Sequence, residues 1–171
     1  MRVSRLIAAV LLSVAWSSAC AFEQAFEAPA FVVSVPAIPN LRLATVAPSG
    51  PATGMSARGR DDTYSIEVTA LASPQAGSTR TCAGQFLRDL VKQPRMPDRD
   101  SIYRAPFDTN TFLVLYIIEQ PGPKVLHAHL VSAVAGTHCI DAHFSRDMKA
   151  GEDEDAWRTT FAGASVREGA R

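Results

Sequence analysis

The chain has 171 residues, of which 17 are basic and 17 acidic, so its formal net charge is zero. That balance argues against a dedicated nucleic-acid binder, which would carry a basic excess. Apolar residues make up 47% of the chain, and this length and composition are typical of a single domain with its own hydrophobic core.

The first 21 residues have the organisation of a secretory signal peptide. Arg2 and Arg5 form a basic start, residues 6–16 are an apolar run too short to span a bilayer with ease, and small residues surround Ala21. We therefore expect residues 1–21 to be removed on export, with cleavage after Ala21, and the mature protein to be periplasmic or secreted. No second membrane segment is expected in the remaining sequence.

Cys20 allows a rival interpretation of the same segment. Ser17-Ser18-Ala19-Cys20 resembles a bacterial lipobox, in which the cysteine becomes the lipidated first residue. That resemblance implies an envelope protein anchored to the outer membrane through possible lipidation of Cys20. In the alternative, the cysteine is lost with the leader.

Residues 22–62 are rich in proline, alanine and glycine, which predicts a flexible arm. Within this arm, residues 31–35 (Phe-Val-Val-Ser-Val) could pair as a short strand. Residues 64–71 then alternate apolar and polar side chains, which predicts a half-buried strand.

A helix is expected from Thr79 or Thr81 to Lys92, capped by Ser78 or Thr79 and ended by a proline. Cys82, Phe86 and Leu90 fall on one stripe of this helix. Residues 93–106 follow as a loop with three prolines. We expect this loop to provide the contact surface for a partner protein of the cell envelope, with these anchors: Arg95, Met96, Arg99, Tyr103 and Arg104.

Residues 111–144 predict three antiparallel strands, and the first is apolar on both faces, as expected of a strand covered on both sides. A three-residue loop at 135–137 would pair Val134 with His138 and His129 with His143. This register gathers the apolar side chains on one face and the polar ones, with Cys139, on the other.

Cys82 and Cys139 are the two cysteines that remain after the leader. An even number of cysteines in an exported chain predicts one disulfide bond. The helical stripe and the strand register place both side chains in the layer between the helix and the hairpin. Two free buried thiols are the alternative.

Four polar side chains on the hairpin could hold a metal ion: His127, His129, Asp141 and His143. Three imidazoles and a carboxylate suit zinc. However, alternate residues on a strand project in parallel and the expected helix would crowd them, so hydrogen-bonded histidines without a metal are the other interpretation, which we favour. In that case we expect no cofactor. We also expect no catalytic residues, because no catalytic motif for a nucleophile, a phosphate or a dinucleotide is present.

The C-terminal part predicts an acidic start at residues 152–155, an amphipathic helix at 156–164 that buries Trp157 and Phe161, and a frayed tail at 168–171. The expected fold is therefore α+β. It comprises an antiparallel sheet of four to five strands flanked by two helices, with one disulfide, in a single domain spanning residues 63–167.

Residues 136–145 (Gly-Thr-His-Cys-Ile-Asp-Ala-His-Phe-Ser), followed by the acidic helix, resemble the end of small exported bacterial domains of the PsbP/Mog1 class. The resemblance implies an antiparallel sheet flanked by helices and a binding or assembly role without catalytic residues. We accordingly expect an exported, non-enzymatic binding or interaction protein. The alternatives are a metal-binding protein or metal-dependent enzyme that uses the hairpin histidines, and a lipid-tethered envelope protein.

Overall fold

The structure is a computed structural model that describes residues 21–39, 41–46, 54–94, 101–106, 110–119, 121–153 and 155–169. The elements follow in this order: β1 (Phe22–Glu27), β2 (Ala30–Val35), β3 (Ala44–Val46), β4 (Gly54–Arg60), β5 (Ser65–Ala72), α1 (Thr79–Leu90), β6 (Tyr103–Pro106), β7 (Phe112–Ile118), β8 (Val125–Val134), β9 (His138–Asp147), α2 (Ala156–Thr160) and β10 (Ser165–Glu168). Within these ranges no helix is both long and apolar enough to cross a membrane.

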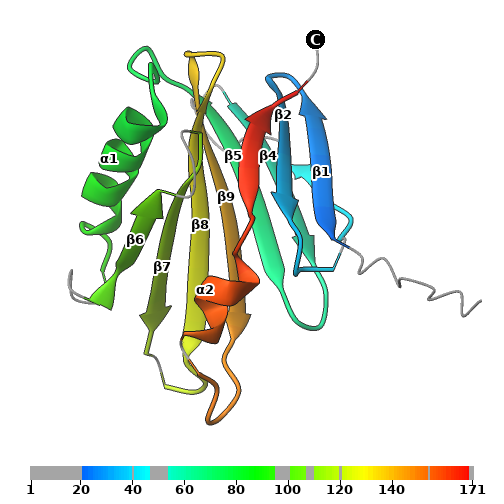
Figure 1. The fold of residues 1–171 in the computed structure, drawn as a ribbon, viewed down its shortest axis with the longest axis vertical. Helices are drawn as coiled ribbons and strands as arrows, with labels where there is room; N and C mark the ends of the chain where they lie inside the picture. The colour runs from blue at the N-terminus through cyan, green and yellow to red at the C-terminus, as the bar shows by residue number, and fades with distance from the viewer. Residues whose placement is uncertain are drawn as a thin grey trace, which may run out of the picture.

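The strands form two sheets. A seven-stranded sheet has the order β3-β4-β5-β9-β8-β7-β6, and a three-stranded sheet has the order β1-β2-β10. Every strand pair in both sheets is antiparallel. Figure 1 shows the large sheet between α1 on one side and the small sheet on the other. The α+β class, the two helices and the disulfide are confirmed, but four to five strands was too low a count.

The two faces of the large sheet bury different sets of side chains. One face, which includes Leu130, Ile140 and Phe144, packs against the small sheet and α2 in the main core. The opposite face packs against α1 through two smaller clusters that include Val131 and Val114. Apolar burial on both faces explains why β7 is apolar at both parities.

The register of the β8–β9 hairpin is as predicted. Val134 pairs with His138, and His129 pairs with His143. The loop residues Ala135 and Gly136 have positive φ angles of 53° and 65°, a conformation that glycine adopts without steric cost. Because the register is set by this loop, the histidines at positions 127, 129 and 143 all lie on the α1 face.

Helix α1 begins where the sequence predicted. The hydroxyl of Ser78 accepts a hydrogen bond from the backbone N–H of Thr81 at 3.2 Å and so caps the first turn. The helix ends at Leu90, two residues before the expected end. Cys82 and Cys139 form a disulfide with their Cα atoms 5.5 Å apart, which confirms the predicted bond between helix and hairpin.

The expectation of a flexible arm at residues 22–62 was wrong for the described part of that segment. β1 and β2 pair with each other, and Phe22, Phe31 and Val33 are fully buried in the main core. β4 pairs with β5 along its whole length. The proline content was misleading because Pro29 and Pro36 lie in turns next to strands, where proline is well tolerated.

A matched pair of substitutions distinguishes an integral strand from an arm. Val33 is fully buried and Val32, its neighbour on the other face of β2, is partly exposed. We expect Val33→Ala to lower the free energy of unfolding by about 2 kcal/mol, because a buried valine loses its burial and leaves a cavity. Val32→Ala should cost clearly less. Urea denaturation measures both, and equal small effects would contradict the core position of β2.

Three further boundaries differ from expectation. The loop at residues 93–106 ends in β6, an edge strand whose Pro106 does not disrupt the sheet because an edge strand leaves one side unpaired. The helix at 156–164 stops at Thr160, and the chain returns as β10. In the expected tail at 168–171, Glu168 still belongs to β10, and the N–H of Gly169 donates to the carbonyl of Ala30 at 3.0 Å.

Candidate functional site

Polar and aromatic side chains from three neighbouring strands meet on the face of the large sheet that α1 covers. β8 supplies His127 and His129, β9 supplies Asp141 and His143, and β7 supplies Tyr116. Strand pairing sets their arrangement, because Tyr116 lies opposite His127 and His129 lies opposite His143. We refer to His127, His129 and His143 as the imidazole cluster.

The imidazole cluster brings three potential metal ligands together. One ring nitrogen from each histidine lies within 4.8 Å of the corresponding nitrogens of the other two. Nδ1 of His127 and Nε2 of His143 are 2.9 Å apart and share a hydrogen bond. The structure therefore places these side chains closer together than the spacing of alternate residues on a strand predicts.

The rings are stacked rather than pointed at one centre. His129 and His143 are parallel to within 1°, with ring centroids 4.1 Å apart, and Tyr116 stacks on His127 at 5.0 Å. Because a lone pair lies in the plane of its ring, parallel rings do not direct their nitrogens at one point. A metal ion would have to turn them about the bond that joins ring and Cβ, a rotation with broad minima.

Both ring nitrogens of His129 take part in hydrogen bonds. Its Nδ1 lies 2.9 Å from Oδ1 of Asp141, and its Nε2 lies 3.1 Å from the hydroxyl of Tyr116. An ionised carboxylate only accepts hydrogen bonds, so Nδ1 donates and Nε2 is left with the lone pair. A carboxylate that fixes the tautomer of a histidine in this way is the usual outer partner of a metal ligand.

Burial keeps His127, His143 and Tyr116 uncharged at neutral pH. Burial first, and then repulsion from His129, lower the pKa of His127 to about 4. Burial and the two neighbouring imidazoles lower the pKa of His143 to about 2. Burial also raises the pKa of Tyr116, and the charge of Asp141 adds to that rise. Neutral imidazoles offer their lone pairs without competition from protons.

Helix α1 covers the deep part of the imidazole cluster. The ring of Phe86 lies 4.7 Å from the ring of His129, which is 6% exposed. His127 and His143 are partly exposed, and the side chain of Asp141 is 28% exposed. The cluster is therefore closed at His129 and reaches solvent at its other members.

The four side chains that the sequence singled out as possible metal ligands are thus neighbours, with Asp141 behind His129. Sequence reasoning missed Tyr116 and Phe86. Phe86 was assigned to the buried stripe of the helix, but its contact with a histidine was not foreseen. Tyr116 could have been found only from the register of β7 against β8, which the turn at residues 121–123 does not define in the sequence.

The predicted partner surface remains a prediction. Arg95, Met96 and Arg99 lie outside the described residues, as does Cys20. Tyr103 and Arg104 lie in the edge strand β6, and the guanidinium of Arg158 sits 4.3 Å from the centroid of the Tyr103 ring. Tyr103 is therefore engaged by the protein's own arginine.

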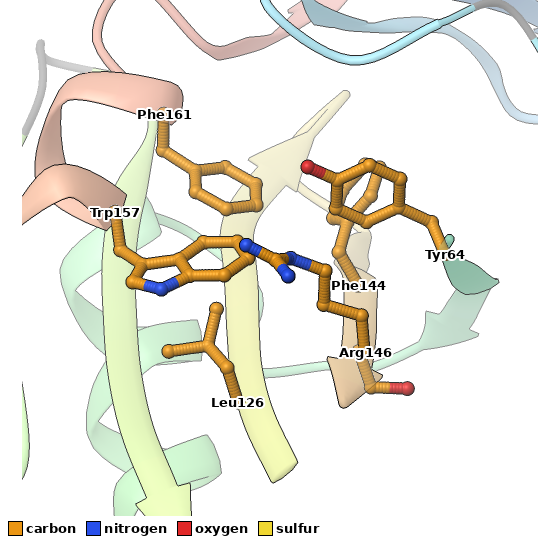
Figure 2. Close-up of a pocket in the computed structure, with 7 residues that line it drawn as sticks. Tyr64, Leu126, Phe144, Arg146, Trp157 and Phe161 are labelled. Atoms are coloured by element: carbon orange, nitrogen blue, oxygen red, sulfur yellow. The ribbon is translucent and has the colours of Figure 1, made fainter. Parts of the chain in front are cut away.

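A second concave region lies beneath α2, on the other face of the sheet, and Figure 2 shows its lining. Arg146 crosses it with its guanidinium 3.9 Å from the Trp157 ring and forms an ion pair with Glu152. The indole N–H of Trp157 is buried there without a hydrogen-bond partner among the described residues. The side chains of Arg146, Trp157 and their neighbours occupy this region, so we interpret it as a packed structural element.

Comparisons with known proteins show no family for the chain. No family model and no curated protein matches it. One similar solved structure is a crystal structure from Bacteroides thetaiotaomicron VPI-5482, with 12% sequence identity and a TM-score of 0.47. The match covers 82% of this chain and 46% of that one, so this chain spans less than half of that protein. The resemblance to the PsbP/Mog1 class therefore remains a prediction.

Proposed function

We propose that this protein is an exported, non-enzymatic binding protein, and that it binds a transition-metal ion such as zinc through the imidazole cluster. The proximity of three imidazole nitrogens, all within 4.8 Å of one another, carries the proposal. Neutral imidazole is a good ligand for zinc, copper and nickel, whereas calcium and magnesium prefer oxygen ligands. Cys82 and Cys139 add no soft ligand because they are joined in the disulfide.

The closed deep part of the site supports binding rather than catalysis. A catalytic zinc site keeps one position open for water or substrate. Here Phe86 and Tyr116 contact His129 from α1 and β7, and the deep part of the cluster is closed. The outer partner Asp141 supports a metal site of either kind, because it orients His129.

Export is supported by the disulfide, because such bonds persist in oxidising compartments and are rare in the cytosol. The signal-peptide pattern of residues 1–21 agrees with this. Intact mass spectrometry of the mature protein tests it. A first residue at Phe22 agrees with cleavage after Ala21, a lipidated Cys20 identifies the tethered alternative, and an uncleaved chain in the cytoplasm contradicts export.

Calorimetric titration of the purified, EDTA-treated mature protein with zinc and with copper tests the binding function. We expect one ion per chain and a raised melting temperature, since a ligand that binds the folded state stabilises it. Replacing a ligand, as in His143→Ala, should weaken binding by more than the roughly 10–100-fold that loss of an outer partner costs.

His138→Ala is the matched control. His138 lies at the start of β9, beside the hairpin loop, and hydrogen-bonds to the neighbouring Thr137 rather than to the cluster. Its replacement removes one imidazole but should leave metal affinity unchanged. Equal loss in both variants would point to nonspecific binding by surface histidines. If the wild-type protein takes up neither metal and neither metal shifts its melting temperature, the binding function is refuted.

A further inference from the structure

We propose that the hydroxyl oxygen of Tyr116 is the fourth donor of this metal site, which makes it a closed centre of three histidines and one tyrosine. This inference rests on the proposed function, since it assigns a further ligand to the same ion. It changes the expected chemistry of the site, because a phenolate oxygen adds negative charge and occupies the position that a catalytic ion would leave to water.

The distances between donor atoms carry the inference. In a tetrahedral site with metal–nitrogen bonds of about 2.0 Å, neighbouring donors lie about 3.3 Å apart. Nδ1 of His127 and Nε2 of His143 are already 2.9 Å apart. Nε2 of His129 and the Tyr116 oxygen are 3.1 Å apart. Each of these two donor pairs thus has about the spacing of one edge of such a tetrahedron.

To bind one metal ion, the donor pair of His127 and His143 must approach the pair of His129 and Tyr116. One nitrogen of each imidazole lies within 4.8 Å of a nitrogen of the other two, and turning the rings about the bond to Cβ would bring these atoms toward the spacing of a tetrahedral edge. Tyr116 stacks on both histidines of β8, at 5.0 Å from His127 and 5.6 Å from His129. The tyrosine, which forms one donor pair with His129, is therefore also in contact with His127 of the other pair.

Asp141 is excluded as the fourth donor by its position. Its two carboxylate oxygens lie 2.9 Å and 3.1 Å from Nδ1 of His129. Because that hydrogen bond uses Nδ1, His129 must bind a metal through Nε2, and the atom next to Nε2 is the Tyr116 oxygen. The carboxylate remains behind the ring as the outer partner.

Metal binding exchanges protons and hydrogen bonds for metal–ligand bonds. The O–H bond of Tyr116 breaks, the oxygen keeps the electron pair and forms the bond to the metal, and the proton leaves to solvent. His129 loses the hydrogen bond that its Nε2 accepted and donates that lone pair to the metal instead. In the hydrogen bond between Nδ1 of His127 and Nε2 of His143, the donor nitrogen loses its proton, which is replaced through solvent on the other nitrogen of the same ring. Both lone pairs then form bonds to the metal, with no net release of protons from this pair.

Visible absorption during titration with copper(II) tests the ligand directly. A phenolate bound to copper(II) gives a charge-transfer band that imidazole ligands alone do not give. We expect the wild-type protein to develop this band up to one equivalent of copper. Tyr116→Phe, which keeps the ring but lacks the oxygen, should lose the band and release about one proton fewer per ion bound.

Tyr103→Phe is the control, because Tyr103 belongs to the edge strand β6 and contacts Arg158 instead of the imidazole cluster. The charge-transfer band of the Tyr103→Phe variant should be as intense as that of the wild type. Copper binding by the wild type without the band overturns the assignment of Tyr116 while the metal-binding function stands. Absence of copper and zinc binding overturns both. The wild-type spectrum decides the matter even if Tyr116→Phe folds poorly.

Discussion

Replacing Cys82 and Cys139 together by alanine is expected to lower the free energy of unfolding by about 4 kcal/mol. The two cysteines are 57 residues apart in the sequence, so their bond closes a long loop in the unfolded chain. In the chain-entropy model, the loss of this closure adds conformational freedom to the unfolded state and leaves the folded contacts nearly unchanged. The melting temperature should fall by roughly 10 °C.

Urea denaturation of the double variant beside the wild type measures this effect. Wild-type protein unfolded in the presence of a reductant should show the same loss, because it lacks the same bond without any change of sequence. Helix α1 should remain folded in the variant, since Ala83 and Leu90 are buried against the sheet independently of the disulfide. Equal stability of oxidised and reduced protein would contradict the expected role of the bond.

Local periodicity was sufficient to predict the centre of this fold. The alternation along β8 and β9, with a loop of three residues, defined the register of the hairpin. The helical stripe of α1 defined where Cys82 would point. Two independent patterns therefore placed both sulfurs in one layer, where the disulfide forms.

The second sheet could not be predicted from local patterns alone, because its third strand, β10, is distant from β1 and β2 in the sequence. β10 pairs with β2 across most of the length of the chain, and the backbone N–H of Val166 donates to the side chain of Thr111, 55 residues earlier. Short strands between prolines resemble a linker until a partner strand is known. Long-range pairing is decided by burial of Phe22 and Phe31, which composition alone does not reveal.

The candidate site likewise has some features that local sequence patterns predicted and others that they did not. The hairpin register brought His129 opposite His143, as the sequence indicated, and Asp141 onto the same face. The convergence of His127 on His143 was not expected, because it depends on side-chain rotamers that bring diagonal neighbours into contact. Tyr116 belongs to a strand whose register is set by the longer turn before β8, so its place beside the histidines had no local signal.

Acid is expected to destabilise the metal-free protein well before its carboxylates lose their charge. In the folded state the pKa of His127 is lowered to about 4 and that of His143 to about 2, whereas both titrate near 6.5 when unfolded. Below pH 6.5 the unfolded chain therefore binds more protons than the folded one. The contribution of these two histidines to stability is fully present above about pH 6.5 and is lost as the pH falls toward 4 and below.

The charged groups around His127 and His143 do not reverse this expected loss of stability in acid. Asp141 is directed at His129, and Glu67, the cross-strand neighbour of His143 on β5, pairs with Arg58. Helix α1 presents the uncharged Phe86 to the cluster. No carboxylate in the described structure is therefore bonded to His127 or His143 to favour its charged form.

Urea denaturation between about pH 7.5 and pH 4.5 in EDTA, a range chosen to span the unfolded pKa near 6.5, tests this expectation. The free energy of unfolding should fall steadily below about pH 6.5. His143→Gln should flatten the decline, because glutamine takes up no proton on unfolding. His138→Gln, which removes a histidine outside the cluster, should leave the contribution of the cluster intact. A wild-type stability that stays level to the acid end of this range would show that the imidazoles accept protons in the folded state, and that the cluster is far more open to water than its burial indicates.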